Sequence, residues 1–214
     1  MYNPIKMPRN KSFANNYWEV YSPKLSRTVR LFSNLEYEHW LLIEIDRTIK
    51  NFCEQPLKIQ YFKDGRMKES IFDMWIQYHN QVEEFREVKH IVDLPTPRAK
   101  QQIELQKNWC NDHGYSYKVV TDYNIRNNPI LLDNAKIIIP YLKNSSDITI
   151  QDMNSILKYI ENYKNISIKD IKQSFNQWHP NKVLHIIYRL LYNQEIHGDI
   201  EKSPLNNYFK VWLT

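Results

Sequence analysis

Acidic and basic side chains interrupt two short apolar segments near the middle of the chain. Asp73 lies within residues 71–76 (IFDMWI), whereas Glu87 and Lys89 close residues 85–89 (FREVK). Short apolar runs predict β-strands, and the alternation of side chains along a strand turns Glu87 and Lys89 to the same face. If the two strands pair, Asp73 joins them. Because an unpaired carboxylate among apolar residues is costly to bury, we expect a cation near Asp73.

Two carboxylates beside one ammonium group can bind a hard divalent cation through oxygen ligands. Lys89 is then available to act on an attacking water or on the charge that develops on a phosphate. This combination is typical of sites that hydrolyse phosphodiesters. The same spacing also arises by chance in a chain in which 25% of the residues are charged, and it then forms only a solvated strand edge.

Length, charge and hydropathy narrow the class of protein. With 214 residues, the chain is long enough for one full domain and a smaller second one. The formal net charge of +5 favours a polyanionic partner without requiring one. No apolar stretch reaches the length of a membrane span, and the N-terminus lacks the apolar core of a signal peptide. We therefore expect a cytoplasmic protein with no membrane partner.

The number and spacing of the glycine and cysteine residues exclude several kinds of binding site. The chain has 3 glycines, too few and too dispersed to build a Walker loop or a dinucleotide-binding fingerprint. Cys53 and Cys110 show neither CxxC spacing nor a histidine at metal-ligand spacing. We expect them to be reduced thiols of a bacterial cytosol and expect no structural zinc.

The order of predicted elements indicates an α/β fold. Ser33 and Glu36 form a capping pattern before an apolar run, and Asp64 and Gly65 are typical of a hairpin turn. We predict helices over residues 34–46 and 98–113, and strands over residues 57–62, 71–76, 85–89 and 115–120. This αβββαβ order is that of a restriction-endonuclease-like nuclease core, to which we assign residues 1–125.

Glu36 and Glu38 are competing candidates for a carboxylate on the first helix. Capping alone explains Glu36, although it shares a helical stripe with Trp40 and Ile43, which can turn its carboxylate to the interior. Glu38 lies on a second apolar stripe of the same helix. Helix geometry alone therefore does not choose between them.

The two ends of the chain differ in composition from this core. Residues 1–30 are polar and basic, and we predict an extended arm that either contacts phosphates or stays solvated. Residues 126–214 form a second predicted domain, with helices over residues 149–163, 167–175 and 183–192 and strands over residues 195–200 and 208–213. Three helices and a hairpin indicate a winged-helix-like domain, which reads DNA or docks on a protein. The few hydrogen-bond donors on its third helix favour docking.

A set of short motifs follows a fixed order along the chain: residues 22–27 (SPKLSR), 33–36 (SNLE), Asp46, residues 54–56 (EQP), 72–73 (FD) and 87–89 (EVK). In this order the motifs resemble the TnsA family, the endonuclease subunits of heteromeric transposases. The resemblance covers most of the chain and is one of architecture over residues 125–214. It implies a restriction-endonuclease-like catalytic domain followed by a winged-helix-type domain.

The resemblance also implies roles for individual residues. Glu36, Asp73 and Lys89 would be the catalytic residues. The metal ligands would be Glu36, Asp73, Glu87 and the carbonyl group of Val88, binding Mg²⁺, for which Mn²⁺ would substitute. Some TnsA proteins place Gln at the position of Glu87, so this site is closer to the usual acid-x-lysine pattern of restriction enzymes.

The partners follow from the same resemblance. Proteins of this family nick the 5′ ends of a transposon, while a TnsB-like DDE transposase cuts the 3′ ends and a TnsC-like AAA+ regulator controls the reaction. We therefore expect double-stranded DNA at transposon ends and these two proteins as partners. Two other classes remain open: a free-standing restriction or repair endonuclease with the same catalytic residues, and a non-catalytic winged-helix DNA-binding regulator, which would need one of those residues to be lost.

Overall fold

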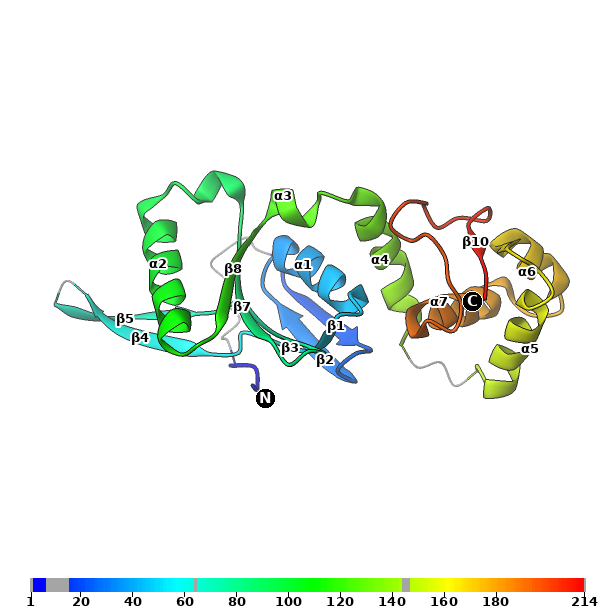
Figure 1. Cartoon of the computed structure of the whole chain (residues 1–214), viewed down its shortest axis with the longest axis horizontal. Coiled ribbons are helices and arrows are strands. Elements are labelled where there is room, and N and C mark those ends of the chain that lie inside the picture. The colour runs from blue at the N-terminus through cyan, green and yellow to red at the C-terminus, as the bar shows by residue number, and fades with distance from the viewer. Residues whose placement is uncertain (1, 7–15, 64, 144–146, 214) are drawn as a thin grey trace. The chain divides into compact units, whose positions relative to one another are not determined.

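The computed structural model describes residues 2–6, 16–63, 65–143 and 147–213, which form two compact units, Met1–Asn127 and Asn128–Thr214 (Figure 1). The elements of the first unit are β1 (Trp18–Ser22), β2 (Arg27–Leu31), α1 (Asn34–Ile45), β3 (Ile49–Glu54), β4 (Lys58–Lys63), β5 (Arg66–Ile71), β6 (Met74–Tyr78), β7 (Glu83–Lys89), η1 (Ile91–Asp93), α2 (Pro97–Asp112), β8 (Ser116–Thr121) and α3 (Asp122–Ile125). The catalytic and winged-helix-like labels given to residues 1–125 and 126–214 stay predictions.

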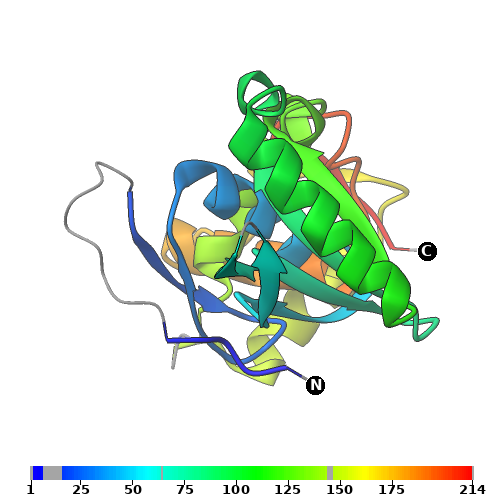
Figure 2. The ribbon, with the colours of Figure 1, turned by 90° about the vertical axis from the view of Figure 1, so that its left-hand side faces the viewer.

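A four-stranded sheet organises the first unit. Its strand order is β3-β6-β7-β8, in which β3, β6 and β7 are antiparallel to one another and β8 runs parallel to β7. The sheet lies between α1 and α2 (Figure 1), and α2 crosses the strands when the unit is seen from the side of that helix (Figure 2). The prediction of a mixed α/β fold is thus confirmed. When the separate β4–β5 ribbon and the short η1 are set aside, α1, β3, β6, β7, α2 and β8 give an αβββαβ order along the chain.

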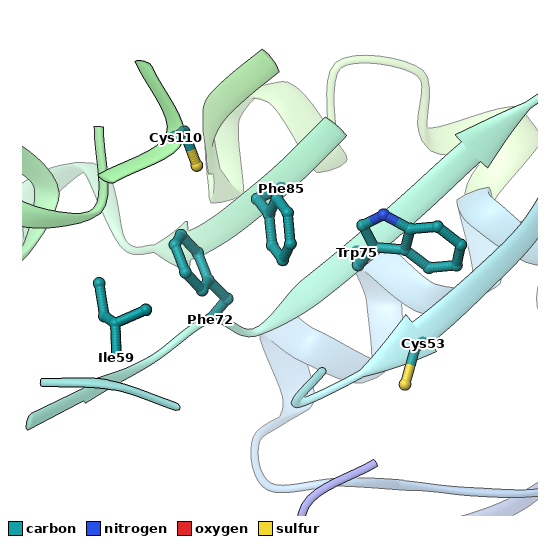
Figure 3. Packing of buried hydrophobic residues seen from close by; sticks show 6 residues of the cluster. All are labelled: Cys53, Ile59, Phe72, Trp75, Phe85 and Cys110. Carbon is teal, nitrogen blue, oxygen red and sulfur yellow. The ribbon is translucent and has the colours of Figure 1, made fainter. Parts of the chain in front are cut away.

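Aromatic side chains fill the space between the sheet and α2. One row of paired residues crosses all four strands and consists of Cys53, Trp75, Phe85 and Tyr117. Ile59, Phe72 and Cys110 belong to the same cluster (Figure 3), and the ring centroids of Phe72 and Phe85 lie 4.6 Å apart. Burial of such rings strongly favours folding. It therefore holds α2 on the face of the sheet to which Phe85, and two residues later Glu87, point.

The first strand of the sheet differs from the prediction. The prediction that residues 57–62 form a strand of the core sheet is wrong. Residues 58–62 belong to β4, which pairs with β5 in a separate two-stranded ribbon. The core strand is β3, whose pairing with β6 shifts register between Ile49 and Asn51. This bulge breaks the alternation of buried and exposed residues that predicts a strand. The predicted turn falls between β4 and β5, where Gly65 has a φ of 72° and Asp64 lies outside the described residues.

The N-terminal region is folded, so the predicted extended arm is wrong for residues 16–30. β1 and β2 pair as an antiparallel hairpin. In its turn, Lys24 donates from Nζ to carbonyl oxygens at the end of α1 and the start of β3, over 2.6 to 2.9 Å. Arg27 forms a 2.6 Å ion pair with the buried carboxylate of Glu54. These basic side chains thus hold the hairpin to the core. Residues 1 and 7–15 of the predicted arm lie outside the described part of the chain.

The second unit is mainly helical. It contains α4 (Pro129–Tyr141), α5 (Ile150–Ile160), β9 (Ile166–Ser167), α6 (Ile168–Ser174), α7 (Pro180–Asn193) and β10 (Lys210–Val211). The predicted helices correspond to α5, α6 and α7. The predicted pairing of residues 195–200 with 208–213 is reduced to one bridge between His197 and Trp212, and β10 pairs with β9 instead. The winged-helix-like character of this unit stays a prediction.

None of the helices in the described residues has the length and apolar character needed to cross a bilayer. The cytoplasmic location expected from the sequence stays a prediction.

We predict that Lys24→Met lowers the free energy of unfolding by about 2 kcal/mol, since it leaves carbonyl groups next to α1 without their donor. Urea denaturation followed by tryptophan fluorescence measures this loss. Lys50→Met is the matched control, because Lys50 is exposed on β3. Equal stability of the two variants would show that Lys24 is not a structural cation.

Candidate active site

Antiparallel pairing of β6 with β7 brings the predicted acidic residues together. The register pairs Met74 with Arg86, so Asp73, one residue earlier, comes level with Glu87. Contrary to the prediction, Asp73 lies in the break between β5 and β6 and not inside a strand. The N–H group of Val88 donates to Oδ2 of Asp73 over 2.7 Å. The carboxylate of Asp73 is thereby tied to the strand that carries Glu87 and Lys89.

The first turn of α1 supplies a further carboxylate. Ser33 caps the helix by accepting from the N–H of Glu36 over 3.1 Å, and its hydroxyl donates to Oε1 of Glu36. Oε2 of Glu36 accepts from the N–H of Phe32 over 3.1 Å. Glu38, by contrast, pairs with Arg126 over 2.8 Å. The structure therefore places Glu36, and not Glu38, beside Asp73.

Gln55, directly after β3, connects these carboxylates. Its backbone adopts the left-handed region with a φ of 39°, which is strained for a residue with a side chain. The backbone N–H of Gln55 donates to the carbonyl oxygen of Asp73 over 3.0 Å, and its side chain donates to Oε2 of Glu36 over 3.2 Å. Its own carbonyl oxygen accepts from the N–H of Ile5 over 3.0 Å. One buried residue thus contacts Glu36, Asp73 and the N-terminal segment.

Glu87 lies behind this group, with 0% of its surface exposed. Its Oε1 accepts from Lys89 and, over 2.7 Å, from Gln102, while its Oε2 accepts from Gln106 over 2.8 Å. A carboxylate offers about four acceptor positions, so these donors leave about one, on Oε2. The ammonium group of Lys89 is held by Glu87, two residues earlier on the same strand.

A cleft of ≈ 640 Å³ opens onto the carboxylates. Glu36 and Asp73 line it, together with Tyr61 and Lys68 from the β4–β5 ribbon and Arg98 from the first turn of α2. As whole residues, Glu36 and Asp73 are partly exposed, whereas Glu87 is fully buried. A cleft lined by both acidic and basic side chains, including Glu69 beside Lys68, suits an anionic ligand that approaches with a cation.

Burial is the main cause of the raised pKa values of the acids of this site, and repulsion from Asp73 adds to it for Glu36 and Glu87. Burial, and then the charge of Asp73, raises the pKa of Glu36 to about 7 and that of Glu87 to about 8. Burial also raises the pKa of Asp73, although the charge of Lys89 opposes this. Burial lowers the pKa of Lys89, but the carboxylates of Glu87 and Asp73 outweigh it and raise that pKa. Such shifts show that the negative charge of these buried acids is not fully compensated within the protein.

The donor chemistry fits a hard divalent cation. Among the described residues, no group of three or more His, Cys, Asp and Glu side chains is arranged so that it could hold a metal ion. Mg²⁺ does not require such a cage, because it keeps several waters and is bound through one or two carboxylates together with substrate phosphates. Glu36 and Asp73 provide such oxygen atoms at the cleft. The full predicted ligand set, with Glu87 and the Val88 carbonyl, stays a prediction.

Several glutamines of this site are absent from the sequence-based assignment. Gln55, Gln102 and Gln106 each donate to one of its carboxylates. One signal was available for Gln106: it shares a helical stripe with Ile103 and Cys110, where an apolar residue is expected. A polar residue on a packed stripe indicates a buried hydrogen-bond partner.

Comparison with known families matches residues 46–122 to a model described as TnsA-like endonuclease N terminal. The matched residues run from the end of α1 to the end of β8 and include Asp73, Glu87 and Lys89. Glu36 lies before the start of the match, so the match does not bear on its place in the site. Comparison with curated proteins gives no match.

We predict that the pKa of Glu36 makes the protein less stable as the pH rises. Below about pH 4.5 the carboxyl group is protonated in both states; between that value and about 7, only the unfolded chain loses the proton. The free energy of unfolding therefore falls over this window and levels off above it. Glu36→Gln removes this contribution, so the variant should gain stability relative to the original chain between pH 5 and pH 8. Denaturant titrations without metal measure the difference, and a difference independent of pH would contradict the burial of Glu36.

Proposed function

We infer that the chain is an endonuclease of the TnsA-like family, since residues 46–122 carry the N-terminal domain of that family. We propose more specifically that it is the metal-dependent endonuclease subunit of a heteromeric transposase and cleaves the 5′ ends of the transposon during cut-and-paste transposition. The observation that supports this best is the position of Asp73. Its carboxylate is fixed by the N–H of Val88, and its charge affects both Glu36 and Glu87 beside the single ammonium of Lys89.

The roles of the residues follow from their contacts. Glu36 and Asp73 face the cleft and are the proposed side-chain ligands of Mg²⁺, with Val88 contributing its carbonyl oxygen and Glu87 its remaining acceptor position. When bound, the metal would polarise the scissile phosphate and lower the pKa of a bound water. Lys89, held by Glu87, would orient the attacking water or stabilise the charge on the phosphate. Arg98 and Lys68, at the cleft, would bind flanking phosphates of the DNA.

The wider assembly is also part of the proposal. A TnsB-like DDE transposase would cut the 3′ ends, and a TnsC-like AAA+ regulator would license the reaction. The second unit is proposed as a winged-helix-like domain that docks on one of these partners. The order α5, β9, α6, α7 and β10, with the bridge between His197 and Trp212, supports this assignment.

We predict that Asp73→Asn and Lys89→Ala each lower the rate of 5′-end cleavage by about 100-fold or more, because each removes a charge that acts on the reacting phosphate. The assay follows nicking of labelled transposon-end DNA by the chain together with a TnsB-like DDE transposase and a TnsC-like AAA+ regulator. Glu36→Ala should have a similar effect.

Glu38→Ala is the matched control on the same helix, because Glu38 pairs with Arg126 outside the cleft. It should cleave at the original rate. Normal cleavage by Asp73→Asn would overturn the site assignment. Efficient and specific cleavage by the original chain without any partner would favour a free-standing nuclease.

We also predict a defined metal dependence. Mg²⁺ and Mn²⁺ should support cleavage, whereas Ca²⁺, with its longer and less regular coordination, should support DNA binding with little turnover. Removal of metal by EDTA should abolish cleavage, and added Mg²⁺ should restore it. Undiminished cleavage in EDTA would contradict the proposed role of the carboxylates.

A further inference from the structure

A buried glutamine on α2 donates a hydrogen bond to Glu87 of the candidate site. Gln106 is on α2, and 0% of its surface is exposed. Its Nε2 atom donates to Oε2 of Glu87 over 2.8 Å and to the hydroxyl of Ser70 over 3.0 Å, and it lies 3.3 Å from the carbonyl oxygen of Ile71. Its Oε1 atom accepts from the hydroxyl of Tyr117 over 2.8 Å. Gln106 thus connects β5, β7 and β8 through one amide group.

The carboxylate of Glu87, which can only accept, and the hydroxyl of Tyr117, which donates to Oε1, together fix which way this amide faces. Because Tyr117 donates to Oε1 of Gln106, both amide hydrogens point to the other side, where Glu87 and Ser70 accept them. The reverse orientation would place the amide oxygen against the carboxylate of Glu87 and leave buried groups without partners, which is costly. The amide therefore has one favourable orientation.

Gln102, one helical turn before Gln106, acts on the other oxygen of the same carboxylate. It donates to Oε1 of Glu87 over 2.7 Å, and Lys89 donates to that same oxygen. Donors at both oxygens prevent the carboxylate from rotating about its axis. Since Lys89 is bound to this carboxylate, the direction of its ammonium group depends on the orientation that the two glutamines impose on Glu87.

We propose that Gln106 is a positioning residue that, supported by Tyr117 and Gln102, orients Glu87 and through it the ammonium group of Lys89. This inference rests on the proposed nuclease function and goes beyond it, because it places a determinant of the rate on α2, away from the reacting atoms. Packing alone does not account for the residue. Gln106 shares its stripe with Cys110, which packs in the apolar cluster, and a methionine would fill a similar volume there without a buried amide.

The test compares Gln106→Met with Asn108→Ala, an exposed amide residue on the same helix. Gln106→Met should lower the single-turnover rate of cleavage by about 10- to 100-fold, as the loss of a residue that supports a ligand does. The affinity for transposon-end DNA should change less than about twofold, because Gln106 is buried and does not reach the DNA. Tyr117→Phe, which frees the amide to turn over, should give an intermediate loss, and Asn108→Ala none.

A second readout does not depend on cleavage. In the metal-free protein, competitive acetylation read by peptide mass spectrometry should label Lys89 several-fold faster in Gln106→Met, while the exposed Lys107 and Lys118 are labelled as before. Unchanged cleavage and unchanged Lys89 labelling would overturn the proposal. So would a parallel increase at all three lysines, which would indicate general loosening. If the original chain never cleaves DNA, the proposed function fails, and the labelling of Lys89 alone then decides the positioning role.

Discussion

The pairing of β6 with β7 is the constraint on which the site depends. It sets Asp73 beside Glu87, and the N–H of Val88 then fixes one oxygen of Asp73. A shift of one residue in this pairing would turn every side chain of β7 to the opposite face. The aromatic row that includes Trp75 and Phe85 makes such a shift costly. Packing along the middle of these strands thereby protects the placement of charge where β6 begins and β7 ends.

The charge pattern of the site is unfavourable for the fold and useful for chemistry. Glu36, Asp73 and Glu87 are gathered around one ammonium group, and the pKa of each is raised. A protein selected only for stability would not keep these acids together at partial or full burial. The surrounding hydrogen bonds hold the group in place, and a divalent cation would relieve its excess of negative charge. This balance is the physical basis for our proposal of a metal-dependent reaction in the cleft.

Residues that show a pattern with close neighbours in the chain could be predicted from the sequence. Residues whose partners are far away in the chain could not. Glu87 and Lys89 were found because a strand alternates over two residues, and Ser33 with Glu36 because capping acts within one turn. The choice of Glu36 over Glu38 needed the fold, since both lie on the same helix. Gln106 was missed because its partners are distant in the chain. β3 was missed for another reason, since a register shift interrupts its periodicity.

The strained turn at Gln55 has a mechanical consequence. Its backbone holds Asp73, its side chain holds Glu36, and its carbonyl oxygen is held in turn by the N–H of Ile5. A left-handed residue with a side chain stores about 1 kcal/mol or more and persists only where its neighbours restrain it. Residues 2–6 are one of those restraints. A force on this N-terminal segment therefore reaches, through Gln55, the spacing between Glu36 and Asp73.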